Sequence, residues 1–153
     1  MAVTTFNGID ELRSAAGTHL GYSPWVEVTQ EQVDTFAEAT GDHQWIHVDV
    51  ERANAESPFG GPIAHGYLTL SLTNLFLPQV VDVQGVAMGV NRGTGKVRFP
   101  SPVPVGSRLR AGVELVAVDD VTGGVDTTMV ITVEREGSDK PVCVVESLSR
   151  YLA

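Results

Sequence analysis

The chain has 153 residues, of which 42% are hydrophobic, and this length suffices for one domain with a substantial core, residues 1–153. A formal net charge of −9 excludes the basic surface that binding to nucleic acid requires. The N-terminus has no signal-peptide pattern, and polar residues interrupt the apolar stretch 67–83, so we expect no contact with a membrane. With one cysteine, the chain is expected to be cytoplasmic and free of disulfides.

The first third of the chain predicts short helices around one strand. Residues 7–16 favour a helix with Asn7 as its N-cap, and residues 25–28 alternate like a strand. Thr29 opens a capping box, and the amphipathic pattern after it indicates a helix that ends at Gly41.

Two more helices are expected before the pattern changes. Asp49 is the expected N-cap of a short helix through Asn54. The run after Gly66 is apolar on most sides, which predicts a central helix that Pro78 stops. Because a helix this apolar needs cover all round, we expect a curled sheet or a second subunit to enclose it.

The second half of the chain is typical of consecutive strands joined by turns. We expect strands at residues 86–91, 94–99, 109–118, 125–134 and 142–152, with a turn at 119–124. Short connections join antiparallel neighbours, so the sequence predicts an α+β fold with the sheet curled around the central helix. Cys143, in the last strand, is expected to be a buried and unreactive thiol.

Five of the ten basic residues fall close together in the sequence: Arg92, Lys96, Arg98, Arg108 and Arg110. A local cluster of this kind would allow an acidic protein to bind an anionic group. Solvated positions along strands would give the same pattern, and both interpretations remain open.

An acid and an imidazole follow the helix stop at Gly41. Asp42 and His47 stand in a segment with irregular backbone, so their side chains can converge and form a proton-transfer pair. Alternatively, Asp42 is a turn residue and His47 a surface histidine. His43 and His47 have the spacing of metal ligands on a helix, with His65 as the one candidate third ligand. Gly41 and Asp42 argue against a helix there, so we expect no metal site.

A second break in the pattern, residues 60–66 (GGPIAHG), opens the central helix. Its glycines permit a close approach to another backbone, and Pro62 stiffens the segment. The free N–H groups at the helix start, including that of Gly66, carry the positive end of the helix dipole. They suit a carbonyl oxygen that gains charge as an enolate forms. Alternatively, this is a tight turn into a packed helix, with His65 capping or packing.

Three motifs, in this order, resemble the MaoC-like, R-specific enoyl-CoA hydratase family (hydratase 2). Residues 36–49, FAEATGDHQWIHVD, are similar to the family's pattern Gly-Asp-x-Asn-Pro, an apolar residue, His, an apolar residue and Asp, preceded by an aromatic and a small residue. Residues 60–68, GGPIAHGYL, look like its helix opening, and residues 97–107, VRFPSPVPVGS, like its strand and turn. The resemblance covers the chain from about Trp25 onward.

The resemblance implies a hotdog fold, a curved antiparallel sheet around a long central helix, in a homodimer whose sheets join edge to edge. It implies reversible syn addition of water to trans-2-enoyl-CoA, giving (3R)-3-hydroxyacyl-CoA, with the CoA thioester as substrate and no cofactor. By analogy, Asp42 and His47 activate water and protonate the α-carbon, and the N–H of Gly66 holds the thioester oxygen. Which of the two acts as the base remains open.

Gln44–Trp45 stands where the family has Asn-Pro, so Gln44 either holds the water with a longer arm or has lost that role. Asn74 falls where some hydratases carry a serine that faces the acyl chain, which makes it an expected lining residue. The alternatives are a MaoC-like protein with another substrate, such as a nodulation-type protein, a subunit of a larger dehydratase, a non-catalytic acyl-CoA or acyl-carrier binding protein, and a hotdog thioesterase.

Overall fold

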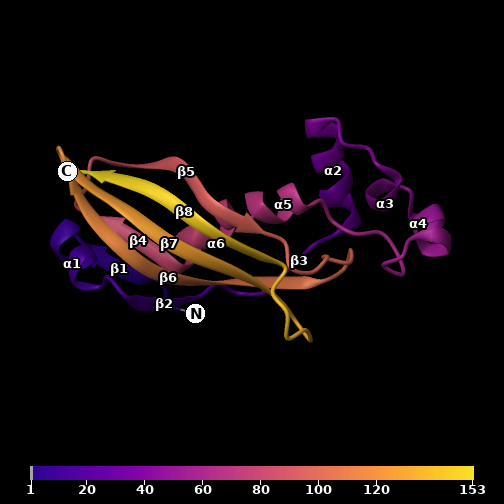
Figure 1. Ribbon diagram of the computed structural model, residues 1–153, viewed down its shortest axis with the longest axis horizontal. Helices are drawn as coiled ribbons and strands as arrows, with labels where there is room; N and C mark the ends of the chain where they lie inside the picture. The colour runs from indigo at the N-terminus through magenta and orange to yellow at the C-terminus, as the bar shows by residue number, and fades with distance from the viewer. Residues whose placement is uncertain (1) are drawn as a thin grey trace.

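One strongly curved sheet dominates the computed structural model, which describes residues 2–153 (Figure 1). Its strands are β2 (Thr18–Tyr22), β3 (Val26–Glu27), β5 (Met88–Arg98), β6 (Arg108–Val121), β7 (Gly124–Arg135) and β8 (Cys143–Leu152). The order is β2-β6-β7-β8-β5, β3 also pairs with β6, and every pair is antiparallel. The predicted antiparallel sheet is therefore confirmed.

Some strand boundaries differ from those predicted. The segments 86–91 and 94–99 form one strand, β5, because register shifts within it absorb the residues that break the alternation. The turn predicted at 119–124 is shorter, since β6 and β7 pair as far as Val121 and Gly124. Two residues are enough to connect a tight hairpin. The polar residues in this stretch suggested a longer turn, although most of them belong to the strands.

The helix enclosed by the sheet consists of α5 (Gly66–Ser71) and α6 (Thr73–Val80), separated at Leu72. The prediction that Pro78 stops this helix is wrong, because Pro78 lies inside α6 and the chain passes from Val80 directly into β4 (Val81–Gln84). Proline removes one hydrogen bond in the last turn, while Phe76 and Val80 on either side of it remain fully buried.

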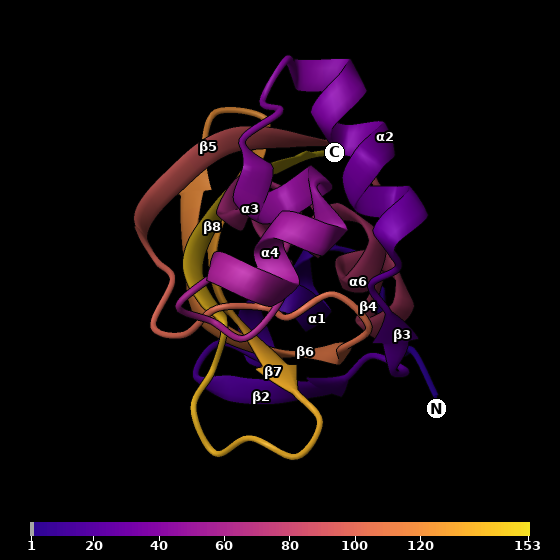
Figure 2. The ribbon, with the colours of Figure 1, turned by 90° about the vertical axis from the view of Figure 1, so that its right-hand side faces the viewer.

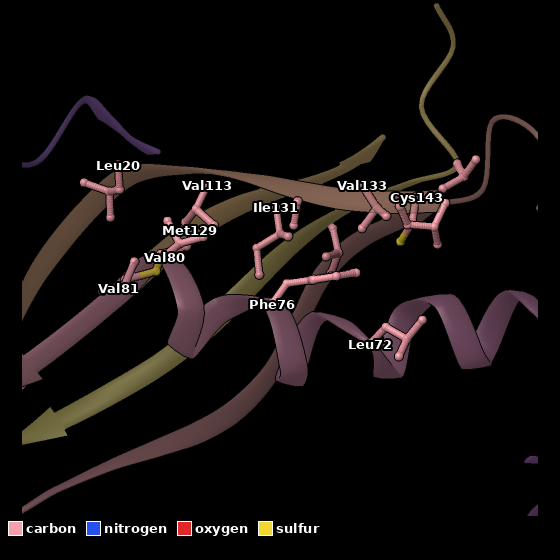
Figure 3. Close-up of a cluster of buried hydrophobic side chains, with 14 of the residues drawn as sticks. Leu20, Leu72, Phe76, Val80, Val81, Val113, Met129, Ile131, Val133 and Cys143 are labelled. Carbon is pink, nitrogen blue, oxygen red and sulfur yellow. The ribbon is translucent and has the colours of Figure 1, made fainter. Parts of the chain in front are cut away.

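The core lies between this helix and the concave face of the sheet. Leu72, Phe76 and Val80 extend from the helix toward side chains of the sheet that include Val113, Met129, Ile131 and Val133 (Figure 3). Buried and half-buried residues alternate along β7, so every second side chain enters the core. Cys143 is buried in β8, and burial raises the pKa of its thiol to about 11, as expected for an unreactive cysteine.

The N-terminal residues fold differently from the prediction. Asn7 is not an N-cap but the last residue of β1 (Thr4–Asn7), which pairs in parallel with β4. Helix α1 (Ile9–Ser14) begins only after Gly8, whose φ of 98° permits the change of direction. Phe6 of β1 is buried in the hydrophobic core, and that burial outweighs the capping preference of asparagine.

Three helices project beyond one end of the sheet: α2 (Gln30–Thr40), α3 (Trp45–Val48) and α4 (Val50–Glu56) (Figures 1 and 2). The predicted caps are confirmed. The hydroxyl of Thr29 accepts a hydrogen bond from the N–H of Gln32 at 3.1 Å, and Gly41 ends α2 with a φ of 82°. The carboxylate of Asp49 accepts from the N–H of Arg52 at 3.1 Å.

A curved antiparallel sheet around a central helix is the hotdog fold, so the predicted α+β class and architecture are confirmed. Within residues 2–153, no helix combines the length and the apolar character needed to cross a membrane.

Candidate active site

The candidate site lies along the chain from the end of α2 to the start of α5, a segment that includes the projecting helices α3 and α4 (Figure 1). The left-handed backbone of Gly41 ends α2, and residues 42–44 form no regular element. The carbonyl of Gln44 then accepts the N–H of His47 at 3.0 Å as the short helix α3 begins. The predicted irregular backbone between Asp42 and His47 is therefore present.

Three side chains converge here, because ligand-type atoms of Asp42, His47 and His65 all lie within 4.8 Å of one another. The two histidines are 6% and 3% exposed, and their rings stack with centroids 3.9 Å apart and planes inclined by 25°. Asp42 is exposed, and its Oδ2 lies 4.0 Å from Nε2 of His65. The structure thus brings together the acid and the imidazole that the sequence indicated.

The backbone determines which nitrogen of His47 is free. Nδ1 lies 2.7 Å from the carbonyl oxygen of Ile63, which only accepts, so Nδ1 carries the proton and Nε2 keeps its lone pair. The N–H of Ile63 donates to the carbonyl of Ile46 at 3.0 Å, and the side-chain amide of Gln30 donates to the carbonyl of His47 at 2.8 Å. The imidazole is therefore held in one orientation.

Burial also favours the neutral form of His47. Its pKa lies below the ordinary value of 6.5, chiefly because burial penalises the charged imidazolium. The Ile63 carbonyl and Asp42 act in the opposite direction, and His65 adds to the lowering. A neutral imidazole with a free Nε2 is the form that can accept a proton from water.

His65 is the third member of the cluster, and the sequence had suggested for it a capping or packing role or, if a metal were bound, that of a third ligand. Its Nε2 lies 2.9 Å from the carbonyl oxygen of Asp42, and the ring of Phe36 lies against it with centroids 4.9 Å apart. Its position directly before the helix-opening Gly66 was the one signal in the sequence that could have identified it.

Gly66 is the first residue of α5, so its N–H has no carbonyl one turn earlier in the helix to bond. The ring of Phe99 packs against it, and a Cβ at this position would lie 3.2 Å from that ring. A hollow of about 370 Å³ opens beside Gly66 and is mainly apolar, being lined also by Phe59, Ile63, Ala64, Thr69, Phe99, Pro100, Ser101, Pro102, Val103 and Val142.

The glycines before this helix act differently from the prediction. Gly60 has a φ of 80°, which only glycine adopts without strain, but no atom lies within 4 Å of the place where its Cβ would be. Gly61 approaches the side chain of Asn54 rather than another backbone. The predicted close approach of two backbones is therefore wrong, and Gly60 serves the turn.

Gln44 and Asn74 lie outside the three-residue cluster. The side chain of Gln44 is exposed, whereas its N–H donates to Oδ1 of Asp42 at 3.3 Å, so it supports the acid with its main chain. Asn74 stands on α6, about 12 Å along the helix from Gly66. It lines a separate hollow of about 320 Å³ together with Asn91, Ser147 and others.

The basic residues do not form a single cluster, so that interpretation is wrong. Arg108 and Arg110 lie on β6 and pair with Glu136 and Glu134. The other three lie on β5, which β7 and β8 separate from β6 in the sheet order. The sequence left both interpretations open, because closeness along the chain does not decide which strands are neighbours in the sheet.

The donor set does not favour a metal ion. His43 lies outside the cluster, exposed, with its Nε2 3.5 Å from Glu38. Nδ1 of His47 and Nε2 of His65 are both directed at backbone carbonyls. Because lone pairs lie in the plane of an imidazole, two nearly parallel stacked rings do not aim them at one point.

The family model described as the MaoC like domain matches residues 11–136. The 3-hydroxyacyl-thioester dehydratase Z of Mycobacterium tuberculosis is 55% identical over 150 residues, which cover 97% of this chain and 99% of that protein. Nodulation protein N of Rhizobium leguminosarum bv. viciae is 45% identical over 86% of this chain and 83% of its own length. The solved (R)-hydratase from A. caviae has the same fold, with a TM-score of 0.72 and 24% identity over 88% of this chain and 94% of that one.

Proposed function

Because the chain belongs to the MaoC-like domain family, we propose that it is an (R)-specific enoyl-CoA hydratase. The proposed reaction is the reversible syn addition of water to trans-2-enoyl-CoA, giving (3R)-3-hydroxyacyl-CoA. The observation that carries the proposal is the convergence of the side chains of Asp42 and His47, with Nε2 of His47 free to accept a proton and Gly66 nearby at a helix start. The relative with 55% identity is named a dehydratase, and dehydration is the reverse of this hydration.

In the proposed mechanism, water binds between the carboxylate of Asp42 and Nε2 of His47. Neutral His47 takes one proton as the water oxygen bonds to C3, and the electron pair of the double bond moves to the α-carbon and the thioester oxygen. The imidazolium then returns its proton to the α-carbon from the same face, which gives syn addition and restores the neutral base. Asp42 orients the water and balances the transient charge on His47.

The thioester oxygen gains negative charge when the enolate forms. The N–H of Gly66, at the positive end of the dipole of α5, would stabilise that oxygen. The apolar hollow beside Gly66 supports an acyl thioester as the substrate, since apolar walls suit a hydrocarbon chain. Asn74 is proposed as a lining residue further along the helix. No cofactor is needed, because water supplies both the hydroxyl and the added proton.

We also propose a homodimer joined at β5, which is one of the two terminal strands of the sheet order. Every residue of this eleven-residue strand is exposed or half-buried, including Met88 and Val90, at 53% and 43% exposure. Tyr67 and Leu75 of the central helix are 72% and 42% exposed. A second copy paired edge to edge would satisfy the free backbone groups and cover apolar surface.

The test is a hydration assay on the purified protein with crotonyl-CoA, monitoring the absorbance of the conjugated thioester. We expect the absorbance to fall and the product to be the (3R)-hydroxyacyl-CoA, identified by chiral analysis. A (3S) or racemic product would contradict the stereochemical assignment. Release of free thiol from saturated acyl-CoA would indicate a thioesterase instead.

A second candidate is a non-catalytic acyl-CoA or acyl-carrier binding protein, favoured by Gln44–Trp45 in place of the family's Asn-Pro. It would bind enoyl-CoA in a calorimetric titration, yet leave short and long enoyl chains unchanged. Size-exclusion chromatography with light scattering tests the dimer, and a monomer at micromolar concentration would contradict it.

A further inference from the structure

His65 is a buried histidine to which the mechanism above assigns no task. It is 3% exposed, its ring stacks on that of His47, and its Nε2 meets the carbonyl oxygen of Asp42 at 2.9 Å. One side chain therefore contacts both members of the water-activating pair. A histidine that served packing alone would not need to contact both of them.

The contact with Asp42 is the more informative of the two. Among residues 2–153, the other hydrogen bonds of Asp42 are made with Thr40 and Gln44, which belong to its own turn. The bond from His65 is thus the one hydrogen bond of Asp42 that reaches beyond residues 40–44. Since Asp42 is exposed, packing does little to fix its position.

The tautomer of His65 follows from the same contact. A carbonyl oxygen only accepts, so Nε2 carries the proton and donates. Nδ1 is then left with a lone pair, and it is buried with no hydrogen-bond partner in the described part of the chain. Burying a polar atom unpaired costs free energy. The chain tolerates this cost at a position where the ring also orients a neighbouring base.

The backbone of His65 adds a third connection. His65 is the N-cap of α5, with φ −62° and ψ 140°, and its carbonyl accepts the N–H of Thr69 at 3.2 Å. The next residue is Gly66, the proposed donor to the thioester oxygen. His65 therefore links the residue that handles water to the residue that holds the substrate.

We propose that His65 is a positioning residue. Its side-chain N–H holds the turn at Asp42, its ring holds that of His47 by stacking, and its backbone connects both to Gly66 at the start of α5. This inference rests on the proposed hydration. Displacing a catalytic group by about 1 Å can cost about 10²-fold in rate, so loss of either contact should reduce kcat while substrate binding persists.

The two contacts can be separated with two variants. His65→Phe keeps a ring to stack on His47 but cannot donate to Asp42, and His65→Gln keeps an N–H donor but not the ring. His43→Gln is the matched control, because His43 is an exposed histidine of the same turn outside the cluster. Circular dichroism and thermal unfolding establish that each variant is folded.

With crotonyl-CoA, we expect each His65 variant to lower kcat by about 10- to 100-fold with KM within about twofold, and His43→Gln to match the wild type. If His65→Phe does not fold, His65→Gln decides the matter. Folded variants with wild-type kcat, or with a raised KM and unchanged kcat, would overturn the positioning role of His65. The proposed hydration would not be affected by that result. A wild type inert on every enoyl chain would remove the proposed function, and this inference with it.

A second measurement does not depend on activity. Long-range ¹H–¹⁵N NMR at neutral pH should show the Nε2–H tautomer for His65 and the Nδ1–H tautomer for His47. An Nδ1–H tautomer for His65 would mean that the contact with Asp42 is not made in solution, and the inference would be wrong.

Discussion

The sheet core and the segment from Gly41 to Gly66 are held together in different ways. In the core, apolar side chains such as Phe76 and Ile131 interlock, and their burial fixes the backbone around them. In the Gly41–Gly66 segment, hydrogen bonds between backbone carbonyls and histidine rings take this part: the carbonyl of Ile63 orients His47, and the carbonyl of Asp42 bonds to His65. A fully buried apolar side chain contributes more to stability than a typical hydrogen bond, which is worth only about 1 kcal/mol. Substitutions in the core should therefore lower mainly stability, and substitutions in the Gly41–Gly66 segment should lower mainly activity.

The largest effect is expected from the pair in the Gly41–Gly66 segment. His47→Gln removes the base, and Asp42→Asn removes the carboxylate that orients the water, so each should lower kcat on crotonyl-CoA by about 10²- to 10⁴-fold. Because Asp42 is exposed, Asp42→Asn should change the free energy of unfolding by no more than about 0.5 kcal/mol. Steady-state kinetics and urea unfolding measure the two quantities. A folded Asp42→Asn protein with wild-type kcat would contradict the role of Asp42 in the reaction.

A core substitution should do the opposite. Phe76 is fully buried on α6, so Phe76→Ala should lower the free energy of unfolding by about 3–5 kcal/mol through lost burial and a residual cavity. Val116→Ala, at a position 45% exposed on β6, is the control and should cost about 0.5 kcal/mol or less. Urea unfolding measures both. Equal losses in the two variants would show that the core is not arranged as described.

Gly66 lies where the two regions meet. In Gly66→Ala, the new Cβ would approach the ring of Phe99 to 3.2 Å and displace it beside the thioester site. We expect kcat/KM to fall about tenfold, with little change in stability because alanine suits a helix. Phe99→Ala in the same chain should restore part of the loss. If Gly66→Ala has no effect, the packing of Phe99 against Gly66 is not part of the site.

The smallest effect is expected at the start of α2. Thr29→Ala removes the hydroxyl that accepts the N–H of Gln32 and should cost about 1 kcal/mol of stability. Thermal unfolding measures this, with Thr29→Ser as the matched control that keeps the oxygen. An equal loss in Thr29→Ser would assign the effect to the methyl group instead.

Local sequence patterns predicted those strands and helix ends that interactions between nearby residues determine. Alternation predicted β6, β7 and β8, and side-chain chemistry predicted the caps at Thr29, Gly41 and Asp49. The same patterns failed where a distant partner decides. The parallel pairing of β1 with β4, the continuation of α6 through Pro78 and the separation of the basic residues all depend on which segments meet in space.

The candidate site divides in the same way. Asp42 and His47 could be proposed because they follow a helix stop within five residues of each other. His65 could not be given its place, because its contacts join residues separated by 18 and 23 positions through a stacked ring and a backbone carbonyl. No periodicity in a sequence records such a contact.

The most direct test is the pH dependence of kcat/KM for crotonyl-CoA, which reports the titration of the free enzyme. Burial lowers the pKa of His47 below 6.5, and only its neutral form accepts a proton from water. The rate should therefore decline about tenfold per pH unit once the pH has fallen below the pKa of His47, which lies below 6.5. The expected result is an acid limb with an apparent pKa below 6.5 that is absent from the residual activity of His47→Gln. An acid limb at or above 6.5, or one unchanged in His47→Gln, would contradict the role of His47 as the base.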